Sequence, residues 1–113
     1  MSKRDLRLLL EDIIESIEKI ERYTEAHSLD QFYNDEKTVD AVVRNFEIIG
    51  EASKQVNKSD KFEFNQIPWR KMVGLRNRII HEYFGIDLNI VWQIKMDFLP
   101  KLLMELKAIR NSL

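Results

Sequence analysis

The sequence of 113 residues contains no cysteine, three glycines and two prolines. The absence of cysteine excludes a disulfide framework, thiolate catalysis and zinc sites built on cysteine. The few glycines and prolines leave little material for hairpin turns, and no segment alternates apolar and polar residues over the length of a strand. We therefore expect the chain to be built from helices.

Long apolar runs and a large excess of one charge are also absent. The longest uncharged runs are too short to cross a bilayer, and charged residues interrupt the first apolar cluster, unlike the apolar core of a secretory signal. A net charge of −1 does not suit a protein that coats nucleic acid through bulk electrostatics. We expect a cytoplasmic protein with no membrane partner, folded as one domain over residues 1–113.

Apolar residues recur at helical spacing in three parts of the chain. They predict long helices at about residues 5–25 and 36–56, joined by a connection at residues 28–35. A third helix is expected from Pro68 to about His81, because proline is well accommodated in the first turn of a helix.

The last of the three apolar stripes runs from Val91 to Ile109 and predicts a fourth helix, which follows Gly85 and the candidate N-cap Asp87. Pro100 lies inside this stripe and should kink the helix. The pattern predicts an all-α fold, an antiparallel bundle of four helices, or five if the kink divides the last one.

Only two side chains can exchange protons near neutral pH, His27 and His81. His27 falls near the expected C-terminus of the first helix, where an imidazole interacts favourably with the helix dipole, and we assign it no chemical function. Taken alone, His81 would also be interpreted as a helix-end histidine.

The neighbours of His81 favour chemistry on phosphate. Arg76 and Arg78 precede it by one to two turns, Asn77 lies four residues before it, and Tyr83 follows two residues later. A guanidinium beside a proton-transfer group can hold phosphate oxygens as negative charge develops on them. Structural roles remain open for each: Arg78 can be solvated or paired with Glu82, Asn77 can bind backbone groups, and Tyr83 can lie at the edge of the core.

The same region carries a local excess of cations. No acidic residue occurs between Glu63 and Glu82, whereas this window contains four basic residues: Arg70, Lys71, Arg76 and Arg78. Any binding of phosphate groups is therefore expected here, with Arg70, Lys71 and Arg78 as candidates. Arg76 and His81 are five residues apart, about 140° around an ideal helix. Either the helix is distorted or two copies of the chain cooperate.

The run Arg76–Tyr83, RNRIIHEY, resembles the signature of the HEPN superfamily, and more narrowly that of the HepT toxins. Five further segments match the usual pattern of that family in order: FEIIGEASKQV (46–56), IPW (67–69), GLRN (74–77), HEYFGID (81–87) and VWQI (91–94). The resemblance thus covers nearly the whole chain.

The resemblance implies a homodimeric, metal-independent endoribonuclease that needs no cofactor, with the two motifs facing each other across the dimer interface. His81 would act as the general base or acid toward the RNA 2′-hydroxyl, and Arg76 would bind the scissile phosphate. Asn77 would support Arg76. Tyr83 matches the tyrosine that a partner nucleotidyltransferase antitoxin modifies with AMP, which would block RNA by adding negative charge.

Three alternatives stay open. The chain can be a non-catalytic module that binds nucleotides or RNA, since many members of the superfamily have that role, or a dimeric scaffold that acts only through its partner complex. A metal hydrolase is disfavoured because there are two histidines in all and no ExxH or HxxxH spacing.

Overall fold

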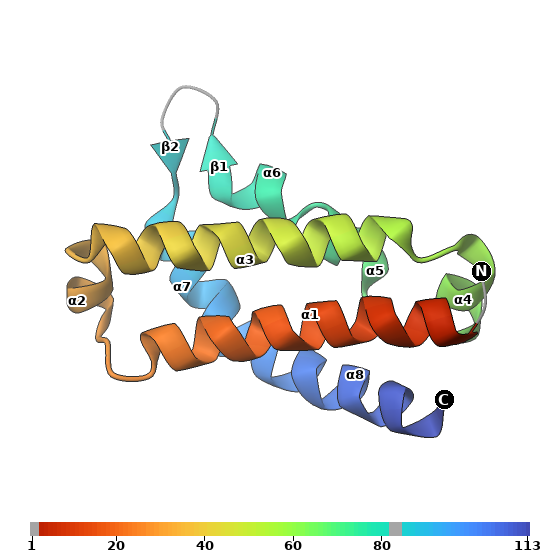
Figure 1. Cartoon of the computed structure of the whole chain (residues 1–113). Coiled ribbons are helices and arrows are strands. Elements are labelled where there is room, and N and C mark those ends of the chain that lie inside the picture. The colour runs from red at the N-terminus through yellow and green to blue at the C-terminus, as the bar shows by residue number, and fades with distance from the viewer. Residues whose placement is uncertain (1–2, 82–84) are drawn as a thin grey trace.

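Two long antiparallel helices, α1 and α3, form the centre of the fold in the computed structural model, which describes residues 3–81 and 85–113 (Figure 1). The elements in chain order are α1 (Lys3–Thr24), α2 (Leu29–Tyr33), α3 (Glu36–Gln55), α4 (Lys58–Glu63), α5 (Trp69–Val73), α6 (Leu75–Ile79), β1 (Ile80–His81), β2 (Gly85–Ile86), α7 (Leu88–Gln93), a π-helical turn (Ile94–Phe98) and α8 (Leu99–Ser112). The predicted predominance of helix is confirmed.

The core lies where α1 meets its neighbours. α1 packs against α3 and α8, while α5 and α6 pack against α3. The predicted stripes of the two long helices are buried except for Leu9, which is partly buried; the buried members are Leu6, Leu10, Ile13, Ile17 and Ile20 on α1, and Val39, Val42, Val43, Phe46, Ile49 and Ala52 on α3. In the described part of the chain, no helix combines the length and the hydropathy that a bilayer span requires.

The predicted connection at residues 28–35 is wrong, because it contains the short helix α2. Ser28 and Gln31 form a capping box there: the Ser28 hydroxyl accepts from the Gln31 N–H at 3.2 Å, and Gln31 Oε1 accepts from the Ser28 N–H at 2.8 Å. A second unpredicted helix, α4, begins at the N-cap Asn57, whose side chain accepts from the Asp60 N–H at 2.8 Å.

The predicted C-terminal stripe is confirmed, and its helix is interrupted next to Pro100. The buried members of the stripe are Val91, Ile94, Leu102, Leu106 and Ile109. A π-helical turn, in which the Leu99 N–H bonds to the Ile94 carbonyl, comes directly before Pro100 in the first turn of α8. Pro100 has no N–H to donate to the carbonyl of Met96, so the α-helical bonding pattern is broken at this point.

The His27 side chain belongs to the start of α3 instead of the end of α1, where it was expected. It lies beyond the end of α1, and its Nε2 is 2.9 Å from Oδ2 of Asp35, the N-cap of α3. Asp35 also accepts from the Thr38 hydroxyl at 2.7 Å and from the Thr38 N–H at 3.1 Å. These bonds connect the two ends of the segment that contains α2.

The Asp35 carboxylate makes a testable contribution to acid stability. The Thr38 hydroxyl, then His27 and the Thr38 N–H, lower the pKa of Asp35 from 3.8 to about 2. Since the unfolded chain takes up this proton at the higher pH, the contribution is complete above 3.8 and is lost as the pH falls from 3.8 to about 2. The unfolding free energy, measured by urea denaturation, should therefore fall less steeply with decreasing pH in Asp35→Asn than in the wild type over this pH range. Identical slopes in the variant and the wild type would contradict this role.

Candidate active site

Helix α6 presents three consecutive polar side chains to the surface. Its first and last residues, Leu75 and Ile79, are four positions apart and are both buried, which fixes the inner side of this single turn. The residues between them, Arg76, Asn77 and Arg78, are exposed. Burial of Leu75 and Ile79 therefore places the three polar residues between them in contact with solvent.

The preceding helix, α5, adds two more exposed cations. Trp69 and Met72 are buried, and the Trp69 Nε1–H donates to the Phe64 carbonyl at 3.1 Å. Arg70 and Lys71 lie between them in sequence and are exposed. The structure therefore brings five of the predicted site residues onto two adjoining short helices, with their polar ends in water.

The predicted third helix, from Pro68 to about His81, is confirmed in part: the structure has two short helices, α5 and α6, in its place, and they end before His81. Gly74 separates α5 from α6, and the chain becomes extended at Ile80. The Ile79 carbonyl, which a continuing helix would pair with the N–H four residues later, instead accepts from the Asp87 N–H at 2.7 Å. A bond to a residue further along the chain thus ends the helix between Arg76 and His81, so the 140° separation of an ideal helix does not apply.

His81 lies on a short antiparallel hairpin. β1 pairs with β2 in the register Ile80 with Ile86 and His81 with Gly85 (Figure 1). Gly85 has a φ of +76°, a backbone conformation that favours glycine. The backbone of His81 is thereby held in a defined register. The predicted modification site, Tyr83, lies outside the described residues.

Among the residues that the structure describes, no carboxylate forms an ion pair with the cations of α5 and α6, which are Arg70, Lys71, Arg76 and Arg78. The surface of these two helices is therefore locally positive, although the net charge of the chain is −1. Such a surface can bind phosphate through charge-assisted hydrogen bonds.

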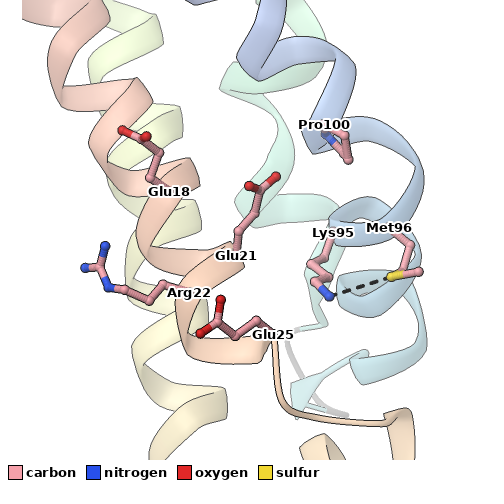
Figure 2. Close-up of a pocket in the computed structure, with 7 residues that line it drawn as sticks. All are labelled: Glu18, Glu21, Arg22, Glu25, Lys95, Met96 and Pro100. Atoms are coloured by element: carbon pink, nitrogen blue, oxygen red, sulfur yellow. Dashed lines mark hydrogen bonds between the residues drawn. The ribbon is translucent and has the colours of Figure 1, made fainter.

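A separate hollow of about 610 Å³ lies between α1 and the C-terminal helices (Figure 2). Its lining includes none of the predicted site residues; it consists of Glu18, Glu21, Arg22, Glu25, Lys95, Met96 and Pro100. Its three carboxylates face two cations, and Lys107 also pairs with Glu18 at 3.3 Å, so the hollow has no excess of cations to hold RNA phosphates. The hollow is therefore a poorer candidate for RNA than the surface of α5 and α6.

Metal ligands are not grouped in the described part of the molecule. Among the side chains that the structure describes, no three His, Asp or Glu residues lie close enough together to hold a metal ion.

Comparison with known proteins identifies the family. Residues 13–109 match the family described as "Ribonuclease HepT-like". A Methanocaldococcus jannaschii protein named "Putative RNase MJ1380" is 41% identical over 109 residues, covering 96% of this chain and 100% of the relative. A Thermococcus cleftensis protein named "Probable ribonuclease HepT" is also 41% identical over 109 residues, covering 96% of this chain and 99% of the relative.

A third relative is less similar to this chain. The Caldanaerobacter subterraneus protein named "Putative RNase TTE0752" is 34% identical over 103 residues, covering 91% of this chain and 92% of the relative. No solved structure shows a significant similarity to this chain. The family match covers α2 to α7 completely, the second half of α1 and most of α8, and with the Arg76 to Tyr83 signature it confirms the resemblance seen in the sequence. The chain belongs to the HepT-like ribonuclease family of the HEPN superfamily.

Proposed function

We propose that this chain is a metal-independent endoribonuclease toxin that cleaves RNA by attack of a 2′-hydroxyl on the adjacent phosphate. The observation that carries the proposal is the arrangement around Arg76. This exposed arginine stands on a helix that ends three residues later, and the chain then leads directly to His81 in a fixed strand register. The names of the relatives support a ribonuclease.

His81 supplies proton transfer in this mechanism. Its imidazole removes the proton from the 2′-hydroxyl, and the freed oxygen attacks the neighbouring phosphorus. The bond from phosphorus to the 5′-oxygen breaks, and that oxygen takes up a proton from an imidazolium. The products are one fragment with a 2′,3′-cyclic phosphate and one with a 5′-hydroxyl, so no metal-bound water is required.

Arg76 stabilises the charge that develops on phosphate. A guanidinium presents several N–H donors in a fixed plane and can contact two phosphate oxygens at once. Asn77, exposed beside Arg76 on α6, supports the arginine in its contact with the phosphate. The exposed cations Arg70, Lys71 and Arg78 bind neighbouring phosphates and hold the strand in place.

Two chains form the complete site in this proposal. The motifs of a homodimer face each other across the subunit interface, so that one RNA strand passes through a cleft lined by Arg76 and His81 of both chains. In this arrangement the α6 helix of one chain contacts one side of the RNA strand, and the partner chain supplies a second set of cations on the other side.

The proposed control of the toxin operates through Tyr83. A nucleotidyltransferase antitoxin would transfer AMP to its hydroxyl, and the added phosphate would repel RNA beside the cleft. A toxin whose substrate is cellular RNA acts in the cytoplasm. The chief alternative function, binding of RNA or nucleotides without cleavage, uses the same exposed cations and differs only in the role of His81.

Incubation of the purified protein with total RNA in EDTA tests the proposal. We expect fragments that accumulate with time, together with a dimeric mass by analytical ultracentrifugation. RNA that is bound but remains intact would favour the non-catalytic alternative and overturn the proposed activity.

A further inference from the structure

A groove opens between α5 and the C-terminal helices, beside the exposed cations of α5. It has a volume of about 230 Å³ and shares no lining residue with the hollow of about 610 Å³. Pro68 and Lys71 line the groove from α5 and its start, and Asp97 and Phe98 line it from the π-helical turn. Its volume is below the roughly 300 Å³ at which sites for drug-sized ligands begin, so the groove suits a ligand the size of one nucleobase.

Phe98 supplies an aromatic ring to this groove. The ring packs against the hydrophobic core and is partly buried, so the core holds it in place while it still lines the groove. Phe98 is also the last residue of the π-helical turn, a type of helix insertion that is frequent at functional sites. An aromatic side chain held in this way can stack on a base with little further loss of conformational freedom.

The charges around the groove favour a neutral ligand. The lining contains two cations, Lys71 and Lys101, and two carboxylates, Asp97 and Glu105. Two of these groups pair with each other, since Lys101 Nζ lies 3.9 Å from Glu105 Oε1. A phosphate in the groove would meet as many negative as positive charges. A neutral base can instead stack on the ring and form hydrogen bonds with the polar side chains around it.

Lys71 connects the groove to the cationic surface of α5 and α6. It lines the groove and is adjacent in sequence to Arg70, and both side chains are exposed. A strand whose phosphates are held by these two cations therefore passes the opening of the groove, where one of its bases can turn inward. Proteins that bind single-stranded RNA combine the same two kinds of contact, cations to phosphates and aromatic rings to bases.

We propose that this groove, with Phe98 as its stacking platform, is a subsite for one unpaired base of the RNA substrate. The inference rests on the proposed ribonuclease function and adds that the substrate is single-stranded where it passes α5. The base inserts beside Phe98, and Lys71 holds the adjacent phosphate. Because every base has an aromatic face, the subsite selects an unpaired nucleotide and not a particular sequence.

The test compares Phe98→Leu, Phe98→Tyr and the control Phe62→Leu in the full chain. Leucine keeps most of the apolar volume and removes the ring, whereas tyrosine keeps the ring. Phe62 is an aromatic residue of α4 that is 80% exposed and lies outside the groove. Fluorescence anisotropy measures the affinity of each protein for a short single strand with every ribose 2′-O-methylated, which the proposed mechanism cannot cleave, and for an equally long sugar–phosphate strand without bases.

We expect Phe98→Leu to weaken binding of the strand with bases about five- to hundredfold, the usual effect of losing one aromatic stacking partner. Its affinity for the strand without bases should be unchanged, and Phe98→Tyr and Phe62→Leu should bind both strands like the wild type. Wild-type affinity of Phe98→Leu for the strand with bases, or an equal loss for both strands, would overturn the subsite. A loss of dimeric mass in Phe98→Leu would also overturn it, because the groove would then belong to the interface between two copies of the chain.

Crosslinking of the wild type gives a second readout that needs no variant. A 2′-O-methylated strand that contains 4-thiouridine should form an adduct at Phe98 on irradiation, located by mass spectrometry of the digested protein. Adducts that are absent from the groove residues would contradict the proposal. If the all-ribose strand stays intact while the methylated strand is bound, the ribonuclease function fails and the comparison at Phe98 still decides the subsite. If the wild type binds neither strand, both proposals are rejected.

Discussion

Replacing His81 with alanine should lower kcat/KM for RNA cleavage by about 10²- to 10⁴-fold, the usual contribution of a positioned general acid or base. Alanine cannot take the proton of the 2′-hydroxyl, and the water that replaces the imidazole is a far weaker base at neutral pH. The measurement is cleavage of a labelled RNA at saturating and at limiting substrate concentrations. The loss should appear mainly in kcat, because His81 acts in the transition state and the cations of α5 and α6 still bind the strand.

His27→Ala is the matched control, since it removes the other histidine of the chain. His27 contacts Asp35 at the start of α3, so its loss should affect acid stability and preserve cleavage. Cutting that survives His81→Ala, or that is lost equally in His27→Ala, would reject the assignment of His81 as the proton-transfer group.

Replacing Arg76 with alanine should lower kcat by about 10²- to 10³-fold, comparable to the loss of one donor from a preorganised anion site. Arg76→Lys should recover only part of this activity, because an ammonium group keeps the charge and loses the planar pair of donors. Since Arg76 is exposed and has no described ion pair, neither variant should unfold the protein. Single-turnover cleavage rates at saturating enzyme measure the effect.

Arg44→Ala provides the control for a change in charge alone. Arg44 is an exposed arginine on α3 whose Nη1 lies 3.8 Å from Glu47 Oε2, and no predicted site residue is on that helix. It should keep nearly full activity. Arg76→Ala with wild-type kcat, or a loss in Arg44→Ala as large as that in Arg76→Ala, would contradict a specific role of Arg76 at the phosphate.

The long helices could be predicted from the sequence because their stability comes from apolar stripes that are visible in the spacing of residues. The short helix α2 carries a readable signal as well, since Ser28 and Gln31 form a capping box. Apolar spacing alone does not detect a helix of five residues with one buried side chain, Phe32. Local capping chemistry is therefore the better guide to such short elements.

The end of the helix before His81 could not be predicted from local pattern. The segment from Leu75 to His81 has apolar spacing compatible with a helix, and what ends it is the bond from the Asp87 N–H to the Ile79 carbonyl. The sequence indicates a junction at Gly85 and a helix cap at Asp87, but their part in closing the hairpin depends on strand register. The sequence thus indicates which residues are candidates for the site, whereas the backbone geometry between Arg76 and His81 required the structure.

The central claim is that a 2′-hydroxyl of the RNA is the nucleophile, activated by His81 and directed at a phosphate held by Arg76. Cleavage of one all-ribose oligonucleotide and of its fully 2′-O-methylated counterpart, both in EDTA, tests this claim most directly. We predict that the ribose strand is cut to fragments ending in a 2′,3′-cyclic phosphate and that the methylated strand stays intact. Cleavage of both strands, or cleavage only after a divalent metal is added, would contradict it.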